Sequence, residues 1–179
     1  DVGDAEEEQL TRQPAGVSRW ELARDSRRIY FVSADSVDTD EKRRLENDFT
    51  VNVYHMETPL ESLWVLDLDA VRARRLTRDP SISVTQFTIS DDSRWVGFRG
   101  VSSNRFERTR GGTIMGSQSN LYSELYLLET ATGQIEQLTR AVEINKSGPY
   151  FSPDGRWVAF IGPRDMARYT RGLTQRVYL

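Results

Sequence analysis

Short apolar runs, separated by polar residues that favour turns, follow one another along the whole chain. Residues 151–160 (FSPDGRWVAF) show the pattern in one stretch. Pro153 fixes φ, the Asp154 side chain can bond to the backbone ahead of it, and Gly155 accepts a positive φ, so a tight turn is expected. Residues 157–160 are apolar without helical spacing and are rich in strand formers. The stretch therefore predicts a turn followed by a β-strand.

This turn-and-strand motif occurs three times. Residues 89–98 (ISDDSRWVGF) place serine, aspartate, arginine, tryptophan and phenylalanine in the same columns as residues 151–160. Residues 22–31 (LARDSRRIYF) form a weaker copy that keeps the aspartate, an arginine and the final phenylalanine. Both earlier copies have serine in the column of Gly155, so we expect their turns to be less tight.

A second motif repeats out of phase with the first. Residues 63–77 (LWVLDLDAVRARRLT) align column for column with residues 125–139 (LYLLETATGQIEQLT), and each copy reads as strand, short turn and strand. The closing Leu-Thr appears earlier, within residues 8–12 (EQLTR), and residues 176–179 (RVYL) resemble the start of another copy. Repetition on this scale determines the fold class.

Together the two motifs predict four strands per unit. In the second unit these are residues 84–89, 94–98, 124–129 and 134–139. Four antiparallel strands per repeat, arranged radially, form the blade of a β-propeller. Consecutive apolar residues fit strands that are covered on both faces. A β-sandwich would also give short strands and turns, but it does not require the same motifs to return in register.

We therefore expect an all-β chain that forms a partial β-propeller, with about two complete four-stranded antiparallel blades and parts of the flanking blades. Residues 1–179 form one region, and the predicted boundaries are a blade end at 1–16, blades at 17–78 and 79–140, and a half blade at 141–179. Closed propellers need at least about four blades. The chain is thus expected to be a piece of a longer protein or to close by association. Its two uncovered blade faces should be apolar, which predicts self-association.

The connection between the second and third strands is long in both units, at about residues 33–62 and 99–123. These connections leave one side of the disc, and long loops on a rigid scaffold often bind ligands. In the first loop, Asp38 and Glu41 could cap a short helix. The second loop is polar, glycine-rich and basic. We select from it four candidate contacts for substrate or partner: Arg105, Phe106, Arg108 and Arg110.

Composition narrows the function further. The net charge of −3 gives no basic face for nucleic acid, and no apolar run approaches the length of a membrane span. The chain has no cysteine, which excludes thiolate nucleophiles and zinc–thiolate sites, and its single histidine is His55. No Gly-x-Ser-x-Gly occurs, and residues 110–116 (RGGTIMG) lack the Lys-Ser/Thr of a phosphate-binding loop. We expect no metal, no cofactor and no catalysis by this chain alone.

The alternation of SPDGRWVAF with LYLLETATGQIEQLT resembles the blade repeat of TolB-type propellers. The same blade is found in the amino-terminal propellers of prolyl oligopeptidase-family serine peptidases, of the dipeptidyl-peptidase and acylaminoacyl-peptidase types. Residues 27–69, with a charged insertion before LWVLDLD, are similar to bacterial peptidases of this family. The resemblance extends from about Gln9 to Leu179.

The resemblance implies a non-catalytic propeller that gates and positions peptide substrate for an α/β-hydrolase domain, which carries the catalytic triad and is absent from this sequence. Its partners would be peptide substrate and that hydrolase domain. The alternative is a TolB-like propeller that binds a protein partner and has no enzymatic domain. Neither alternative involves nucleic acid or a membrane.

Overall fold

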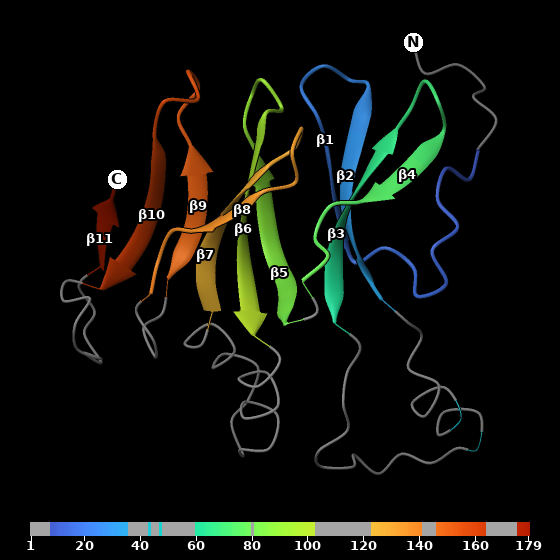
Figure 1. Cartoon of the computed structure of the whole chain (residues 1–179), viewed down its shortest axis with the longest axis horizontal. Helices are drawn as coiled ribbons and strands as arrows, with labels where there is room; N and C mark the ends of the chain where they lie inside the picture. The colour runs from blue at the N-terminus through green and yellow to red at the C-terminus, as the bar shows by residue number, and fades with distance from the viewer. Residues whose placement is uncertain are drawn as a thin grey trace.

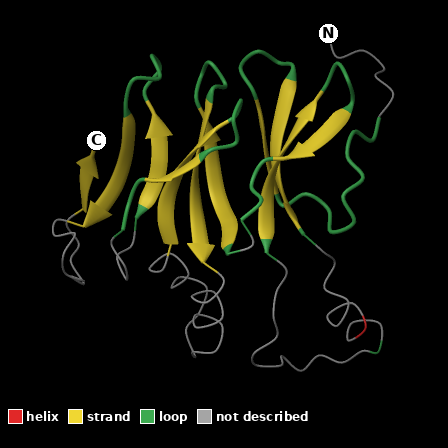
Figure 2. Cartoon of the chain, viewed as in Figure 1, coloured by secondary structure: helices red, strands yellow, loops and turns green. Residues whose placement is uncertain are grey.

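The structure is a computed structural model, and it describes residues 8–35, 43, 47, 60–79, 81–102, 123–140, 146–163 and 175–179. These residues form three antiparallel sheets that stand side by side, each with its strands in chain order (Figure 1; Figure 2). None of the helical residues within the described ranges belongs to a helix with the length and apolar character of a membrane span.

The first sheet consists of β1 (Arg19–Leu22), β2 (Arg28–Ala34), β3 (Glu61–Asp67) and β4 (Arg72–Arg75). The second consists of β5 (Ile82–Ile89), β6 (Trp95–Ser102), β7 (Ser123–Glu129) and β8 (Ile135–Gln137). The third consists of β9 (Ser147–Phe151), β10 (Val158–Pro163) and β11 (Gln175–Tyr178). The prediction of an all-β, partial propeller with two four-stranded blades and part of another is confirmed.

Because every strand pairs antiparallel with the next one, successive connections alternate between the two ends of the strands in each sheet. The turns from β1 to β2 and from β3 to β4 lie at one end of the strands, here called the turn edge, together with the corresponding turns of the second sheet (Figure 1). Strand β2 ends and β3 begins at the opposite end of the strands, here called the loop edge. The long connections predicted from the sequence therefore start and finish at a common edge.

The turn between the first two strands is the same in all three sheets. Ser26, Ser93 and Gly155 have φ values of 55°, 56° and 67°, so all three occupy the left-handed region. Each donates its backbone N–H to the carbonyl three residues earlier, at 2.9, 2.7 and 2.9 Å. The expectation of looser turns at the two serines was wrong. The shared hydrogen bonds hold serine in a conformation that glycine adopts more readily.

The aspartate of the motif is what stabilises these turns. Asp25, Asp92 and Asp154 each accept a hydrogen bond from the backbone N–H two residues later, at 2.9, 3.0 and 3.1 Å. In the second and third sheets a serine hydroxyl also donates to the aspartate, at 2.6 and 2.5 Å. The first sheet has alanine in that column, and the Arg28 guanidinium donates to Asp25 instead. In each case these side-chain hydrogen bonds are the main cause that lowers the aspartate pKa.

The second motif also folds identically in its two copies. The backbone N–H of Leu63 donates to Thr77 Oγ1 at 2.9 Å, and that of Leu125 donates to Thr139 Oγ1 at 3.0 Å. The Leu-Thr that closes each copy therefore ties the fourth strand to the start of the third. Both turns need a positive φ at equivalent positions, where Gly133 has 75° and Val71 has 47°.

The main core lies between the first and second sheets. One cluster joins first-sheet residues with second-sheet residues, and its fully buried members are Tyr30, Val32, Leu63, Val84, Val96, Phe98 and Leu128. Burying each such side chain contributes roughly 1.5–3 kcal/mol. This cluster fixes the first sheet against the second.

A stacked aromatic pair recurs at the same register in each sheet. Phe31 stacks on Trp64 with ring centroids 6.2 Å apart, and Phe98 stacks on Tyr126 at 5.1 Å. In the third sheet Phe160 stacks on Tyr178, also at 5.1 Å. The pair joins the second and third strands of each blade, because its members are direct register partners.

The third sheet approaches the second at Gly97. A Cβ atom at this position would lie 2.4 Å from Pro149 Cγ and 3.3 Å from the Phe151 ring. No real side chain tolerates the shorter distance, so glycine is what allows β9 to pack closely against β6.

Val71 is a β-branched residue in the left-handed region, where such residues are strained. We expect Val71→Gly to raise the free energy of unfolding by about 0.5–1 kcal/mol, since relief of about 1–2 kcal/mol is partly offset by the greater freedom of glycine in the unfolded chain. Urea denaturation measures the change. The reciprocal Gly133→Val should destabilise by a similar amount, and a Val71→Gly chain less stable than the parent would contradict the argument.

Candidate functional site

The four contacts selected from the second long loop lie outside the part of the chain that the structure describes. They are Arg105, Phe106, Arg108 and Arg110, and His55 also lies outside it. Of the charged insertion at 38–48, the structure describes Arg43, which is helical, and Asn47, whose Nδ2 donates to the Arg43 carbonyl at 2.6 Å. These predictions stay predictions.

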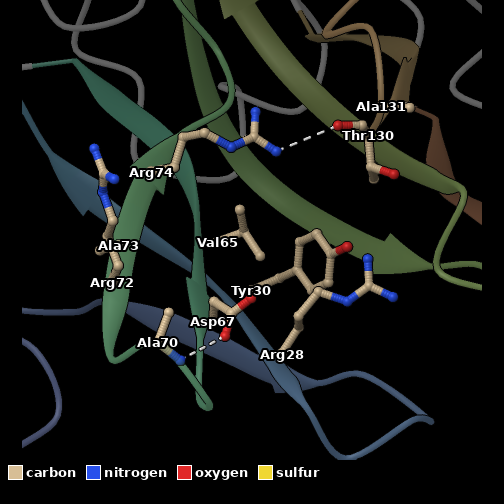
Figure 3. Close-up of a pocket in the computed structure, with 10 residues that line it drawn as sticks. All are labelled: Arg28, Tyr30, Val65, Asp67, Ala70, Arg72, Ala73, Arg74, Thr130 and Ala131. Atoms are coloured by element: carbon tan, nitrogen blue, oxygen red, sulfur yellow. Dashed lines mark hydrogen bonds between the residues drawn. The ribbon is translucent and has the colours of Figure 1, made fainter.

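A pocket of about 680 Å³ lies between the first and second sheets, near the turn edge (Figure 3). Strands β2, β3 and β4 form one side of it, and the turn after β7 closes the other. The polar residues that line it are Arg28, Tyr30, Asp67, Arg72, Arg74 and Thr130. The pocket thus lies at the turn edge. The candidate contacts predicted from the sequence belong instead to a long connection that starts and finishes at the loop edge.

Several of the polar groups around the pocket form hydrogen bonds within the protein. Arg28 forms an ion pair with Asp25 at 2.6 Å, and this hydrogen bond raises the pKa of Arg28. Arg74 donates to the Thr130 carbonyl at 3.3 Å, and Asp67 accepts the backbone N–H of Ala70 at 2.9 Å (Figure 3). These bonds hold the walls of the pocket in place. Of the charged lining groups named here, only Arg28 has a partner of opposite charge within the described part of the chain.

The floor of the pocket is Tyr30, whose side chain is completely buried. Its hydroxyl lies 3.5 Å from the Ser93 carbonyl, at the limit of a hydrogen bond. Burial is the main cause that raises the Tyr30 pKa, since the phenolate would be poorly solvated there. Thr130 Oγ1 satisfies the same carbonyl better, at 3.0 Å. The floor therefore joins two blades through neutral polar groups.

The pocket contains no arrangement that performs catalysis. Its titratable groups are arginines, one aspartate and one tyrosine, and a nucleophile–base pair is not among its lining residues. No cluster of three or more histidine, cysteine, aspartate or glutamate side chains suited to a metal occurs among the described residues.

A buried ion pair stands at the loop edge of the second sheet. Lys146 Nζ lies 3.2 Å from Glu124 Oε2, and the lysine side chain is completely buried. Thr139 Oγ1 also donates to Glu124, at 2.6 Å. Lys146 immediately precedes β9, so the pair links the second sheet to the start of the third. The sequence pattern could not reveal it, because the residues belong to different repeat units.

Comparison with known proteins supports the fold. No protein-family model matches the sequence, and no curated protein matches it significantly. Among solved structures, TolB from Acinetobacter baumannii is 16% identical with a TM-score of 0.53, covering 94% of this chain and 30% of that chain. The fold is a TolB-like β-propeller.

Two proteases show the same fold. The β-propeller domain of the Trilobed protease from Pyrococcus furiosus is 12% identical with a TM-score of 0.50, covering 90% of this chain and 38% of that chain. The tricorn protease is 14% identical with a TM-score of 0.50, and the match covers 82% of this chain and 11% of the tricorn chain. The TolB-like chain thus spans well under half the length of each of these three structures.

The buried tyrosine of the pocket gives a pH prediction. Because the folded-state pKa of Tyr30 is raised, its stabilising effect is fully present below the unfolded pKa of about 10 and is lost as the pH rises through the folded value. We expect the free energy of unfolding to fall above about pH 10, and to fall less steeply in Tyr30→Phe. Denaturation across this range measures both. Equal slopes for parent and variant would contradict the role given to Tyr30.

Proposed function

We propose that this chain is a non-catalytic propeller segment of a prolyl oligopeptidase-like serine peptidase. In this role it gates and positions peptide substrate for an α/β-hydrolase domain, and its own residues perform no bond cleavage. The parent enzyme would be of the acylaminoacyl- or dipeptidyl-peptidase type and of bacterial origin. Arg105, Phe106, Arg108 and Arg110 remain the proposed contacts with substrate or with the hydrolase domain.

The observation that carries the proposal is the repeated blade. Three sheets use the same aspartate turn, and two use the same Leu-Thr closure, in the order of the motif that resembles peptidase propellers. The matches to propellers of two proteases are in keeping with this assignment. The charged insertion before β3 is the feature of the sequence that favours a peptidase over a simple scaffold.

A second function is favoured by the matches to TolB. In that case the chain belongs to a propeller that binds a protein partner and has no enzymatic domain. The pocket between the first two sheets is compatible with both functions, because neither requires catalytic groups in this part of the chain.

The two functions differ in what the complete reading frame encodes. We expect its full product to contain more blades, then Gly-x-Ser-x-Gly and a later histidine. That product should hydrolyse chromogenic peptides and react with a fluorophosphonate probe at one serine outside residues 1–179. The 179-residue chain serves as the control and should neither react nor hydrolyse. A reading frame that ends after a final blade, or a full product without a reactive serine, would contradict the peptidase and leave the TolB-like function.

We further propose that the isolated chain associates with itself through its two outer blade faces. Trp20 and Leu22, which are 69% and 46% exposed, lie on the face of the first sheet that points away from the second. Tyr150 and Val177, which are 43% and 69% exposed, lie on the face of the third sheet that points away from the second. In the interior of the assembly the equivalent faces are covered by a neighbouring sheet.

Sedimentation velocity tests this association. We expect dimers or larger species whose proportion rises with concentration, and a shift toward monomer in the double variant Trp20→Lys and Val177→Lys. Val71→Lys provides a control, because Val71 is 56% exposed but lies on a turn. A compact monomer that binds no apolar dye would show that the outer faces do not associate.

A further inference from the structure

Two arginines from different sheets meet at Thr85. Arg19, on β1, donates through Nη1 to the Thr85 carbonyl. Arg99, on β6, donates through Nε to Thr85 Oγ1 at 3.3 Å and through Nη1 to the Lys146 carbonyl at 3.3 Å. Both guanidinium groups therefore bond to the same residue of the second sheet, one at its carbonyl and the other at its hydroxyl.

A β-bulge makes this meeting possible. The pairing of β5 with β6 passes from Val84 opposite Gly100 to Gln86 opposite Arg99, and Thr85 has no partner between them. Its hydroxyl donates to the Arg99 carbonyl at 3.2 Å, so the bulged residue is held at a defined place. Bulges of this kind often re-aim side chains beside functional sites.

The two guanidinium groups lack a counter-charge within the described part of the chain. Arg24, Arg28 and Arg75 form ion pairs with aspartates there, whereas the partners of Arg19 and Arg99 are a hydroxyl and carbonyls. Arg99 is half-buried, and burial followed by the charge of Arg19 lowers its pKa. Two nearby positive charges, one of them partly desolvated, favour an anion beside them.

Among the described ion pairs, none joins Glu21 or Glu124 to Arg19 or Arg99. Glu21 follows Arg19 by two residues on the same face of β1, and burial raises the pKa of its carboxyl group. Glu124 pairs with Lys146 and accepts the Thr139 hydroxyl. Neither carboxylate is the partner of the arginine pair in the contacts that the structure gives.

We propose that Arg19 and Arg99 form a binding site for a carboxylate group of a ligand. Arginine is suited to this role, because its planar fork binds a carboxylate through two parallel, charge-assisted hydrogen bonds. Thr85 positions both arginines, and most of their N–H donors remain available for the ligand. The site does not depend on whether the propeller serves a peptidase or a protein partner.

Isothermal titration of the 179-residue chain tests the site with three probes: N-acetyl-dialanine as the free acid, its carboxy-terminal amide, and acetate. We expect the free acid and acetate to bind one-to-one, the amide not to bind, and the affinity to fall with added salt. Tighter binding of the peptide acid than of acetate would identify a peptide terminus as the ligand. Equal affinities would identify a site for any small carboxylate.

Two variants and a control separate this site from general charge effects. Arg99→Gln should weaken binding of the free acid by about tenfold to a hundredfold, the usual effect of losing a hydrogen bond to a charged group. Arg19→Gln should weaken it similarly, and it changes an exposed residue, so folding is preserved. Arg27→Gln, at an exposed arginine paired with Asp69, should leave binding unchanged. Binding of the amide as tight as that of the acid, absence of carboxylate binding, or unaltered affinity in both site variants would overturn the proposal.

Discussion

The packing of one sheet face against the next is the interaction on which the rest of this structure depends. Each sheet is too small to bury its apolar residues alone, and the core cluster consists of side chains from two sheets at once. The turns, the Leu-Thr closures and the aromatic pairs act within a sheet, and they fix the strands whose side chains make this contact. The pocket and the arginine pair both lie where adjacent sheets meet, so their geometry follows from the same packing.

Repetition explains why so much of the fold was predictable. The aspartate turn and the Leu-Thr closure each depend on side chains that bond to a backbone group a few residues away, so an identical short sequence gives an identical structure. The strand order then follows, because each turn or loop joins a strand to its neighbour in the same sheet. The conformation of Ser26 and Ser93 was not predictable by the same route, because the residue type alone does not favour a positive φ.

The candidate sites were harder to predict for a physical reason. Arg19 and Thr85 are 66 residues apart, and they meet only because two sheets pack and one strand has a bulge. The same holds for Arg74 and Thr130, which are 56 residues apart. Arg74 and Thr130 each lie in a copy of the second motif, but their contact joins two different repeat units and so cannot be read from either copy alone. The four residues selected from the second long loop were chosen for their chemistry, and the sequence contained no information on where the sheets would place them.

One column of the repeat differs in side-chain volume from sheet to sheet, and this affects how closely the sheets pack. Tyr30, Gly97 and Ala159 occupy equivalent positions of the repeat, and Tyr30 faces the second sheet while Gly97 faces the third. A large ring therefore separates the first sheet from the second, whereas the absence of a side chain lets Pro149 approach the second sheet directly. The side-chain volume at this single column therefore sets how closely neighbouring sheets pack, with the Tyr30 ring filling the first interface and the bare backbone of Gly97 admitting Pro149 at the second.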